Sequence, residues 1–219
     1  MDRTQSTVDD AEDVTTERRR YDSPLRAKRA EETKGALLDA ATELFTAQGW
    51  ANTGMRQVAQ LAGVAVETLY SHYSSKRALL DAVIDRAVMG DSEPVPVARR
   101  TEFLALGRGR RTQRIAAAAS LVAAIHERTG PFAKLIREAA TSDAEIAETL
   151  RATRERQRQD VEAGLMLVMG RHPTERERDG IWAVLSPEVY LLLTQESGWP
   201  NDRYKEWLSE TLARVLPRS

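Results

Sequence analysis

The hydrophobic positions of this chain follow helical spacing almost throughout. Leu37, Ala41, Leu44 and Phe45 recur at the i, i+4, i+7 and i+8 positions of an amphipathic helix, which Gly49 should end. The alternation of β-branched and aromatic residues that marks a strand is not sustained anywhere. The sequence therefore predicts an all-α fold. Helical spacing returns over residues 79–87, 115–126, 181–193 and 204–215.

Glycine and proline indicate where several of these helices end. Gly90 should end the helix over 79–87 in a left-handed conformation. Gly130 and Pro131 should stop the helix over 115–126, because proline lacks the N–H of an interior helical turn.

Two further helices are expected in the second half of the chain. One starts at Ser142, which is spaced from Glu145 as in a capping box. Its middle, RATRERQRQDVE at 151–162, is polar nearly all round, which favours a solvated helix. The other is the helix over 181–193. It must kink at Ser186 and Pro187, or restart with Ser186 as N-cap and Pro187 at the first helical position.

Proline usage divides the chain into parts. No proline occurs between Pro24 and Pro94, and this gap marks a compact unit. We predict a disordered arm over 1–26, a compact domain over 27–90 and a second helical domain over 91–219.

The net charge of −1 hides an uneven distribution near the N-terminus. Residues 1–17 carry six acidic residues against one basic residue, whereas residues 18–34 carry seven basic residues against three acidic ones. An acidic tip followed by a basic stretch is typical of a disordered extension. From composition alone, a solvated charge cluster is favoured over a nucleic-acid contact for the arginines at 18–20.

Composition excludes several classes of protein. No apolar run approaches the ~18 residues of a membrane span, and residues 1–17 lack the apolar core of a secretory signal. We therefore expect a cytoplasmic protein with no membrane contact. The absence of cysteine excludes disulfides, thiolate metal sites and a cysteine nucleophile. Because His72, His126 and His172 are far apart in the sequence, we predict no metal site and no cofactor.

The most informative stretch is MRQVAQLAGVAVETLYSH, residues 55–72, which has the pattern of a helix-turn-helix. Ala59 is the small residue needed where two steeply crossed helices touch, and Gly63 supplies the turn four residues later. The apolar residues expected beneath the two helices are Val58, Ala62, Val64 and Leu69.

With its flanking helices, this stretch resembles the DNA-binding domain of the TetR family of transcriptional regulators. The resemblance covers about residues 30–90. A weaker likeness, in WAVLSPEVYLLLTQESGWPNDRYKEWL at 182–208, is to a subgroup of these regulators with a Trp, Ser-Pro-Glu and Tyr signature. The matching residues are Ala40, Ala41, Leu44, Phe45, Gly49, Ala62, Gly63, Val64, Thr68, Leu69, Tyr70, Lys76, Leu79 and Leu80.

The chain departs from the family at the two helix starts of the motif. Gly54 and Ala65 stand where the family usually has serine or threonine. Loss of such a cap costs ~0.5–2 kcal/mol with alanine, and it removes a hydroxyl that could contact a phosphate. Thr53 could replace the first of these hydroxyls.

The resemblance assigns base reading to the start of the recognition helix. Val66 offers apolar contact, Glu67 could accept from cytosine, and Thr68 could meet a base or a thymine methyl. For Glu67, a first-turn glutamate stabilised by the helix dipole is an equal alternative. Arg56 matches a base-contacting position in some members, where guanine is its natural partner.

The resemblance also implies a set of phosphate contacts. The set is Thr53, Tyr70, Ser71, His72 and Lys76, with Lys76 adding charge at the start of the following helix. For His72 the alternative is an inward residue that closes the motif, because it also falls at an apolar position.

For the C-terminal half, the resemblance implies a domain for ligand binding and dimerisation. Aromatic residues are enriched in interfaces, and they cluster in the last forty residues. The alternative is the chain's own core, but a palindromic operator requires a homodimer with two-fold symmetry. The predicted interface consists of Trp182, Val189, Leu193, Tyr204, Trp207, Leu208 and Leu212.

A small-molecule effector is expected between the helices of this domain. His126 ends an apolar face, although a lone histidine there is more often a hydrogen-bonded core residue than a ligand contact. The candidate pocket residues are Val122, His126, Phe132, Trp182 and Leu185.

Together these features predict a dimeric repressor that a small molecule releases from its DNA operator. One alternative is a ligand-independent regulator or an activator with the same DNA-binding domain. Another is an all-α enzyme or binding protein in which the helix-turn-helix is incidental. The sequence shows no clustered nucleophile and base, so we predict no catalytic residues.

Overall fold

The computed structural model describes residues 9–90 and 97–217, with side chains from residue 26 onward. These residues contain helices and turns but no strand, so the predicted all-α fold is confirmed. The acidic tip before Asp9 and the side chains of the arginine run at 18–20 lie outside this description.

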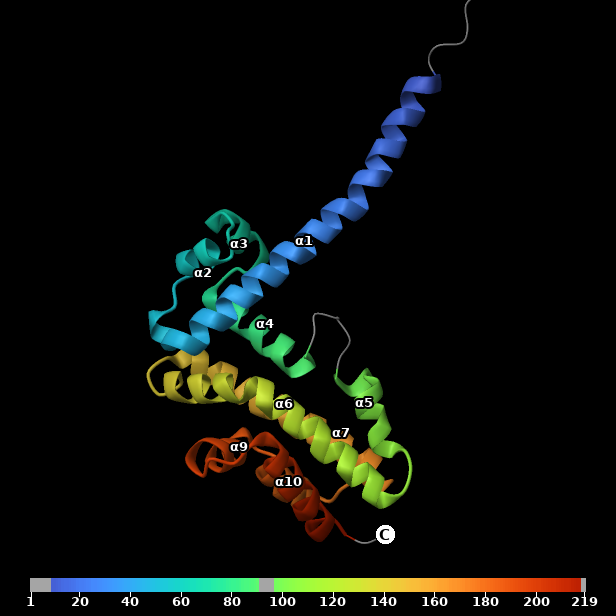
Figure 1. Ribbon diagram of the computed structural model, residues 1–219, viewed down its shortest axis with the longest axis vertical. Helices are drawn as coiled ribbons and strands as arrows, with labels where there is room; N and C mark the ends of the chain where they lie inside the picture. Colours follow the sequence, from blue (N-terminus) through green and yellow to red (C-terminus); the bar gives the residue numbers. More distant parts are fainter. Residues whose placement is uncertain (1–8, 91–96, 218–219) are drawn as a thin grey trace, which may run out of the picture.

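The N-terminal part consists of a long helix and a compact group of three shorter ones. Helix α1 (Asp9–Asn52) projects well beyond the rest of the molecule, and it changes direction at Gly49, where φ is 78° (Figure 1). Helices α2 (Met55–Leu61) and α4 (Lys76–Met89) pack against its second half, and α3 (Val66–His72) packs against α2. We call residues 26–90 the head. Its core includes Leu37, Phe45, Val58, Leu69, Leu79, Leu80 and Val83.

Helix α1 starts inside the stretch for which the sequence predicts a disordered arm. Its backbone is helical from Asp9 onward. The division of the chain at residues 26 and 90 therefore remains a prediction, although Gly90 ends α4 in the expected left-handed conformation, with φ of 83°.

The C-terminal part is a layered helical bundle. Helices α6 and α7 run side by side through its middle, and α9 and α10 cover one side of them (Figure 1). The core of this part includes Phe103, Ile115, Leu165, Ile181, Tyr204 and Leu208. Its elements are the 3₁₀ turns η1 (Val97–Arg99) and η2 (Ala105–Gly107), the π-helical turn η3 (Leu192–Glu196), and the helices α5 (Thr101–Leu104), α6 (Arg111–Ala139), α7 (Ala144–Met169), α8 (Glu175–Val184), α9 (Pro187–Leu191) and α10 (Asn201–Val215).

The predicted stop at Gly130 and Pro131 is wrong. Helix α6 continues through both residues to Ala139, because buried residues on either side of the proline keep this helix packed. Gly130 is needed there for another reason. A Cβ added to Gly130 would lie 3.0 Å from Cε1 of Tyr190, so the glycine makes room for that ring.

Of the two helix starts predicted in the second half of the chain, one is wrong and the other is confirmed. Helix α7 is capped by Asp143 instead of Ser142, since Oδ1 of Asp143 accepts from the backbone N–H groups of Glu145 and Ile146 at 3.0 and 3.2 Å. The predicted restart at Ser186 is confirmed. Its hydroxyl accepts from the backbone N–H of Val189 at 3.3 Å, with Pro187 at the first helical position of α9.

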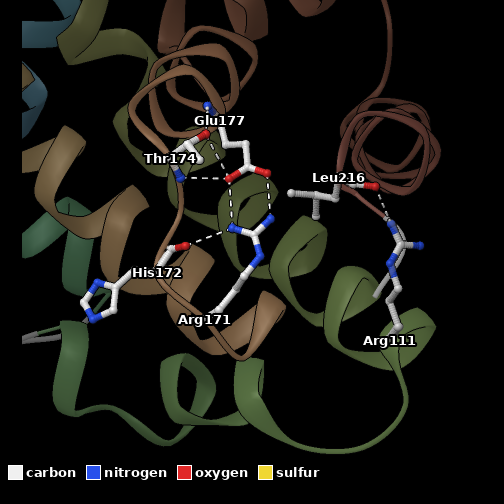
Figure 2. Close-up of polar contacts among 6 residues, drawn as sticks. All are labelled: Arg111, Arg171, His172, Thr174, Glu177 and Leu216. Atoms are coloured by element: carbon white, nitrogen blue, oxygen red, sulfur yellow. Dashed lines mark hydrogen bonds and ion pairs between the residues drawn. The ribbon is translucent and has the colours of Figure 1, made fainter.

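Arginines fix the ends of α8 and α10 (Figure 2). At the start of α8, Glu177 accepts two hydrogen bonds from Arg171, at 2.7 and 3.0 Å, and one from the backbone N–H of Thr174 at 2.8 Å. At the end of α10, Arg111 of α6 donates to the carbonyl oxygen of Leu216 at 2.7 Å. The last helix is thereby tied to the start of α6.

Candidate nucleic-acid interface and ligand cavity

Helices α2 and α3 form the helix-turn-helix that the sequence predicts. Gly63 adopts φ of 69° at the turn, and the backbone N–H of Val64 donates to the carbonyl of Ala59 at 3.0 Å. Val58, Ala59 and Leu69 are buried beneath the two helices. The outer face of α3 is thereby left free for a ligand.

Most of the predicted base-reading residues lie on accessible surface. Arg56 at the start of α2 and Glu67 on α3 are exposed, and Thr68 is half-buried. Val66 is also half-buried and packs against the head core, so less of its side chain is available to a base. Ala65 caps α3 without a side-chain hydrogen bond, as its alanine side chain requires.

The end of α3 presents a polar, accessible surface. Tyr70, Ser71 and His72 are exposed, and the Ser71 hydroxyl donates to the carbonyl of Thr68 at 2.7 Å. The alternative of an inward His72 is wrong. The residue that closes the motif is Tyr73, which is buried and follows His72 directly.

Two other members of the predicted phosphate set point into the protein. The Thr53 side chain is 2% exposed, and its hydroxyl donates to the carbonyl of Gly49 at 2.8 Å. A buried and bonded hydroxyl cannot reach a phosphate, so we remove Thr53 from the set. The Lys76 ammonium donates to the Trp50 carbonyl and lies 4.2 Å from the centroid of the Trp50 ring. Burial lowers the pKa of Lys76, and a phosphate contact would require this side chain to leave Trp50.

Trp50 joins the head to the C-terminal part. Its indole Nε1–H donates to Oδ2 of Asp143 at 2.8 Å, and this bond holds the pKa of the Asp143 carboxyl below its usual range. Because Oδ1 of Asp143 caps α7, one carboxylate contacts both parts of the molecule. We call this contact the Trp50 latch. It was not predicted, because the two residues are 93 positions apart in the sequence.

The two parts also share a hydrophobic core. Phe132, Leu135 and Ile136 of α6 and Ile146 of α7 belong to the same buried cluster as the head residues. Helix α4 contacts α1, α6 and α7, and its Leu79 and Leu80 share one buried cluster with Leu69 of the motif. A movement of α6 or α7 would therefore displace core residues of the head.

The C-terminal part contains a cavity of about 490 Å³. All the candidate pocket residues line this cavity, and they come from α6 and from the end of α8. Ile84, Val88 and Met89 of α4 also line this cavity, so its wall extends into the helix that packs beneath the motif. The predicted residues on the wall are Val122, His126, Phe132, Trp182 and Leu185.

One wall of the cavity is polar, and the sequence reading missed it. Thr153, Gln157 and Asp160 of α7 line the cavity, with Arg156 and Gln159 beside them. The polar segment at 151–162 is therefore only partly a solvated face. No local sequence signal distinguishes its inward residues, because the segment is polar nearly all round.

His126 is both a cavity residue and part of the core. It is 6% exposed, and its Nδ1 shares a hydrogen bond of 2.9 Å with the hydroxyl of Tyr204. Burial lowers the pKa of His126 to about 4, so the imidazole is neutral at pH 7. Tyr190 packs against the same ring, with centroids 5.4 Å apart.

The predicted dimer surface needs correction. Tyr204, Leu208 and Leu212 are at most 2% exposed in the single chain, because α10 turns them toward α6. Side chains already buried cannot provide area to a partner, so this part of the prediction is wrong. Trp207, Leu193 and Val189 keep accessible surface, and the exposed Leu192 and Val215 lie on the same two helical segments.

Trp182 was predicted in both the pocket and the interface. The structure places it on the cavity wall, with the Arg158 guanidinium 4.9 Å from the centroid of its ring.

In the described ranges, no helix is long and apolar enough to cross a membrane. Within the same ranges, no three His, Asp or Glu side chains are grouped as metal ligands.

Comparison with known proteins identifies the motif. The profile of the family described as "Bacterial regulatory proteins, tetR family" matches residues 37–83. The HTH-type transcriptional activator FasR of Mycolicibacterium smegmatis is 40% identical over 80 residues, which cover 34% of this chain and 36% of FasR. The match to the first curated relatives extends over about a third of their length.

Solved structures extend the similarity to the C-terminal part, at the level of the fold. A transcriptional regulator from Aquifex aeolicus is 14% identical with a TM-score of 0.59, over 84% of this chain and 99% of that one. NalD, the secondary repressor of the MexAB-OprM multidrug efflux pump in Pseudomonas aeruginosa, is 22% identical with a TM-score of 0.55, over 87% of this chain and 98% of its own.

Proposed function

We propose that this chain, whose residues 37–83 match the TetR family profile, is a dimeric, sequence-specific regulator whose operator affinity a small molecule lowers. The observation that carries this proposal is the position of α4. Leu79 and Leu80 of α4 are buried in the head core, whereas Val88 and Met89 line the cavity. A single 14-residue helix thus belongs both to the core beneath the DNA-binding motif and to the wall of the cavity.

The DNA-binding surface is the outer face of α3 together with the start of α2. We assign base reading to Arg56, Glu67 and Thr68, which are accessible at the two helix starts. Val66 adds at most a partial apolar contact. Phosphate contacts fall to Tyr70, Ser71 and His72, together with Lys76 after release from Trp50.

Dimerisation would place two such motifs on one palindromic operator. The accessible faces of η3 and α10 supply the proposed interface, with Leu192, Leu193, Trp207 and Val215. Trp199 and Trp207 pack at 6.4 Å between centroids, so this surface carries rigid aromatic area of the kind that anchors interfaces.

The direction of regulation is proposed as repression. A ligand that expands the cavity would shift α4 and move the two α3 helices away from the ~34–36 Å spacing of successive major grooves. Among the compared proteins, FasR is described as an activator and NalD as a repressor. The direction therefore has to be measured for this chain. A DNA-binding regulator would act in the cytoplasm, and the match of the motif to this family favours a regulator over an enzyme.

One experiment tests the proposal in two stages. The full chain selects bound sequences from a random DNA pool, and sedimentation then measures how many protomers occupy the selected site. A small-molecule screen next records release of that site. We expect a palindromic consensus, two protomers and at least one releasing molecule. A random pool after several rounds would contradict the DNA-binding role, and release by no molecule would favour ligand-independent regulation.

A further inference from the structure

The cavity has one polar wall, and that wall comes almost entirely from α7. Thr153, Gln157 and Asp160 are spaced four and three residues apart, so they share one face of the helix. The same face continues as Val161 and Gly164. The other walls, from α4, α6 and α8, are mainly apolar. A ligand that fits these walls has an apolar body and one polar end.

The charges around this wall are unbalanced toward negative. Asp85 of α4, Asp160 and Arg156 are the charged side chains that line the cavity. Burial raises the pKa of both Asp160 and Asp81, and Arg156 is close enough to offset part of each rise, so its single charge is shared between two carboxylates. The carboxylates thus outnumber the basic groups on this wall.

Asp160 is the carboxylate of the polar α7 wall, and it lacks a direct partner. Among the described residues it has no hydrogen-bond or ion-pair partner within bonding distance. Although its side chain keeps accessible surface, the surrounding protein is dense enough for burial to raise its pKa. Asp160 is exposed at the edge of the cavity, so water reaches its carboxylate in the free protein. A ligand that covers it must supply an opposite charge or a donor in place of that water.

We infer that the cavity binds an amphiphilic cation, with an apolar body against α4 and α6 and a single basic nitrogen directed at Asp160. The inference rests on the proposed function, because it names the chemical class of the effector. An anionic ligand would meet the excess of carboxylates, and a neutral one would leave Asp160 without compensation. Asp85 lies on α4, so its attraction to the same cation acts on the helix that supports the motif.

Three probes of matched chain length test the class. Isothermal titration measures the binding of decylammonium, decanol and decanoate to the full chain without DNA. We expect the cation to bind roughly 10- to 100-fold more tightly than decanol, in line with the strength of contacts to a charged group, and decanoate to bind most weakly. Equal affinities for the cation and decanol, or tighter binding of decanoate, would overturn the inference.

Asp160→Asn assigns the effect to one side chain. It should remove most of the advantage of the cation over decanol and leave decanol binding unchanged. Glu148→Gln is the matched control, because it removes a carboxylate from the same helix outside the cavity lining, where Glu148 pairs with Arg151. A cation affinity that survives in Asp160→Asn, or that falls equally in both variants, would also overturn the inference.

Release of operator DNA is measured separately, so the two proposals can fail independently. If only neutral or anionic molecules release the operator, the chain is still a ligand-controlled regulator, but the inference of a cationic ligand is wrong. If the cation binds through Asp160 and releases no operator, the class of ligand stands and ligand-controlled regulation fails.

Discussion

The head and the C-terminal part present their chemistry in opposite ways. In the head, the residues proposed to bind DNA lie on the outer surface of α2 and α3, over a small core of buried apolar residues. In the C-terminal part, the residues proposed to bind a ligand line a cavity between helices that are far apart in the sequence. An exposed motif is fixed by local spacing, whereas an internal site is fixed by packing. Substitutions should therefore affect recognition in one part and stability or coupling in the other.

The largest expected effect is on sequence preference in the head. Arg56→Ala should relax one operator position in each half-site, because a bidentate base contact discriminates by ~1–3 kcal/mol. Non-specific binding should change little, since phosphate contacts remain. Repeating the DNA selection with this variant tests the assignment. Arg77→Ala is the control, because Arg77 pairs with Asp81 on α4 at 3.9 Å. An unchanged consensus for Arg56→Ala would remove it from base reading.

The second effect is a pH dependence of stability that originates in the C-terminal part. The pKa of His126 is lowered to about 4 in the folded state, whereas an unfolded histidine titrates near 6.5. The unfolded state therefore binds more protons between these values, and stability falls as the pH is lowered through this window. From pH 7 to pH 5 the free energy of unfolding should decrease by about 2 kcal/mol from this group.

Denaturant unfolding at several pH values measures this loss. His126→Gln should flatten the dependence between pH 7 and pH 5. The control is His72→Gln, which removes an exposed imidazole from the head and should keep the parent's slope. If His126→Gln and the parent show the same slope, another group is responsible.

The third effect contrasts one glycine from each part. Gly130→Ala should destabilise the chain by about 1 kcal/mol, because overpacking against the Tyr190 ring exceeds the gain from a better helix former. Gly35→Ala in α1 should stabilise it by ~0.5–1 kcal/mol, since nothing lies within 4 Å of the added methyl group. Thermal unfolding of both variants checks the signs. Stabilisation by both would show that Tyr190 moves aside freely.

The sequence predicted the head more completely than the C-terminal part for a physical reason. The roles of Ala59, Gly63 and Leu69 depend on neighbours within the same short motif, so spacing alone is sufficient. The error for Thr53 and the unforeseen contact of Lys76 with Trp50 arise where the motif meets the end of α1, which lies outside that local pattern.

In the C-terminal part, the sequence indicated the apolar walls but not the polar one. Val122, Phe132 and Leu185 belong to apolar stripes, and such stripes turn inward wherever they pack. A polar segment is normally assigned to solvent, so Asp160 could be placed in a cavity only after its neighbouring helices were known. The continuation of α6 through Pro131 likewise depends on tertiary packing, which outweighs the local preference of proline.

The smallest expected effect concerns the latch that joins the two parts. Trp50→Phe keeps an aromatic ring for stacking on Phe45, at 5.8 Å between centroids in the parent, but removes the N–H donor to Asp143. Asp143→Ser keeps a residue type that caps α7 and loses the reach to Trp50. Each variant should reduce the coupling between effector and operator by about 1 kcal/mol, a factor of about 5, with little change in operator affinity alone.

Operator affinity measured with and without the releasing molecule gives that coupling for each variant. If the latch is the shared cause, the double variant should lose no more than either single one, because both changes remove the same bond. Additive losses would mean that Trp50 and Asp143 act separately. Full coupling in both single variants would leave α4 as the route between the cavity and the DNA-binding motif.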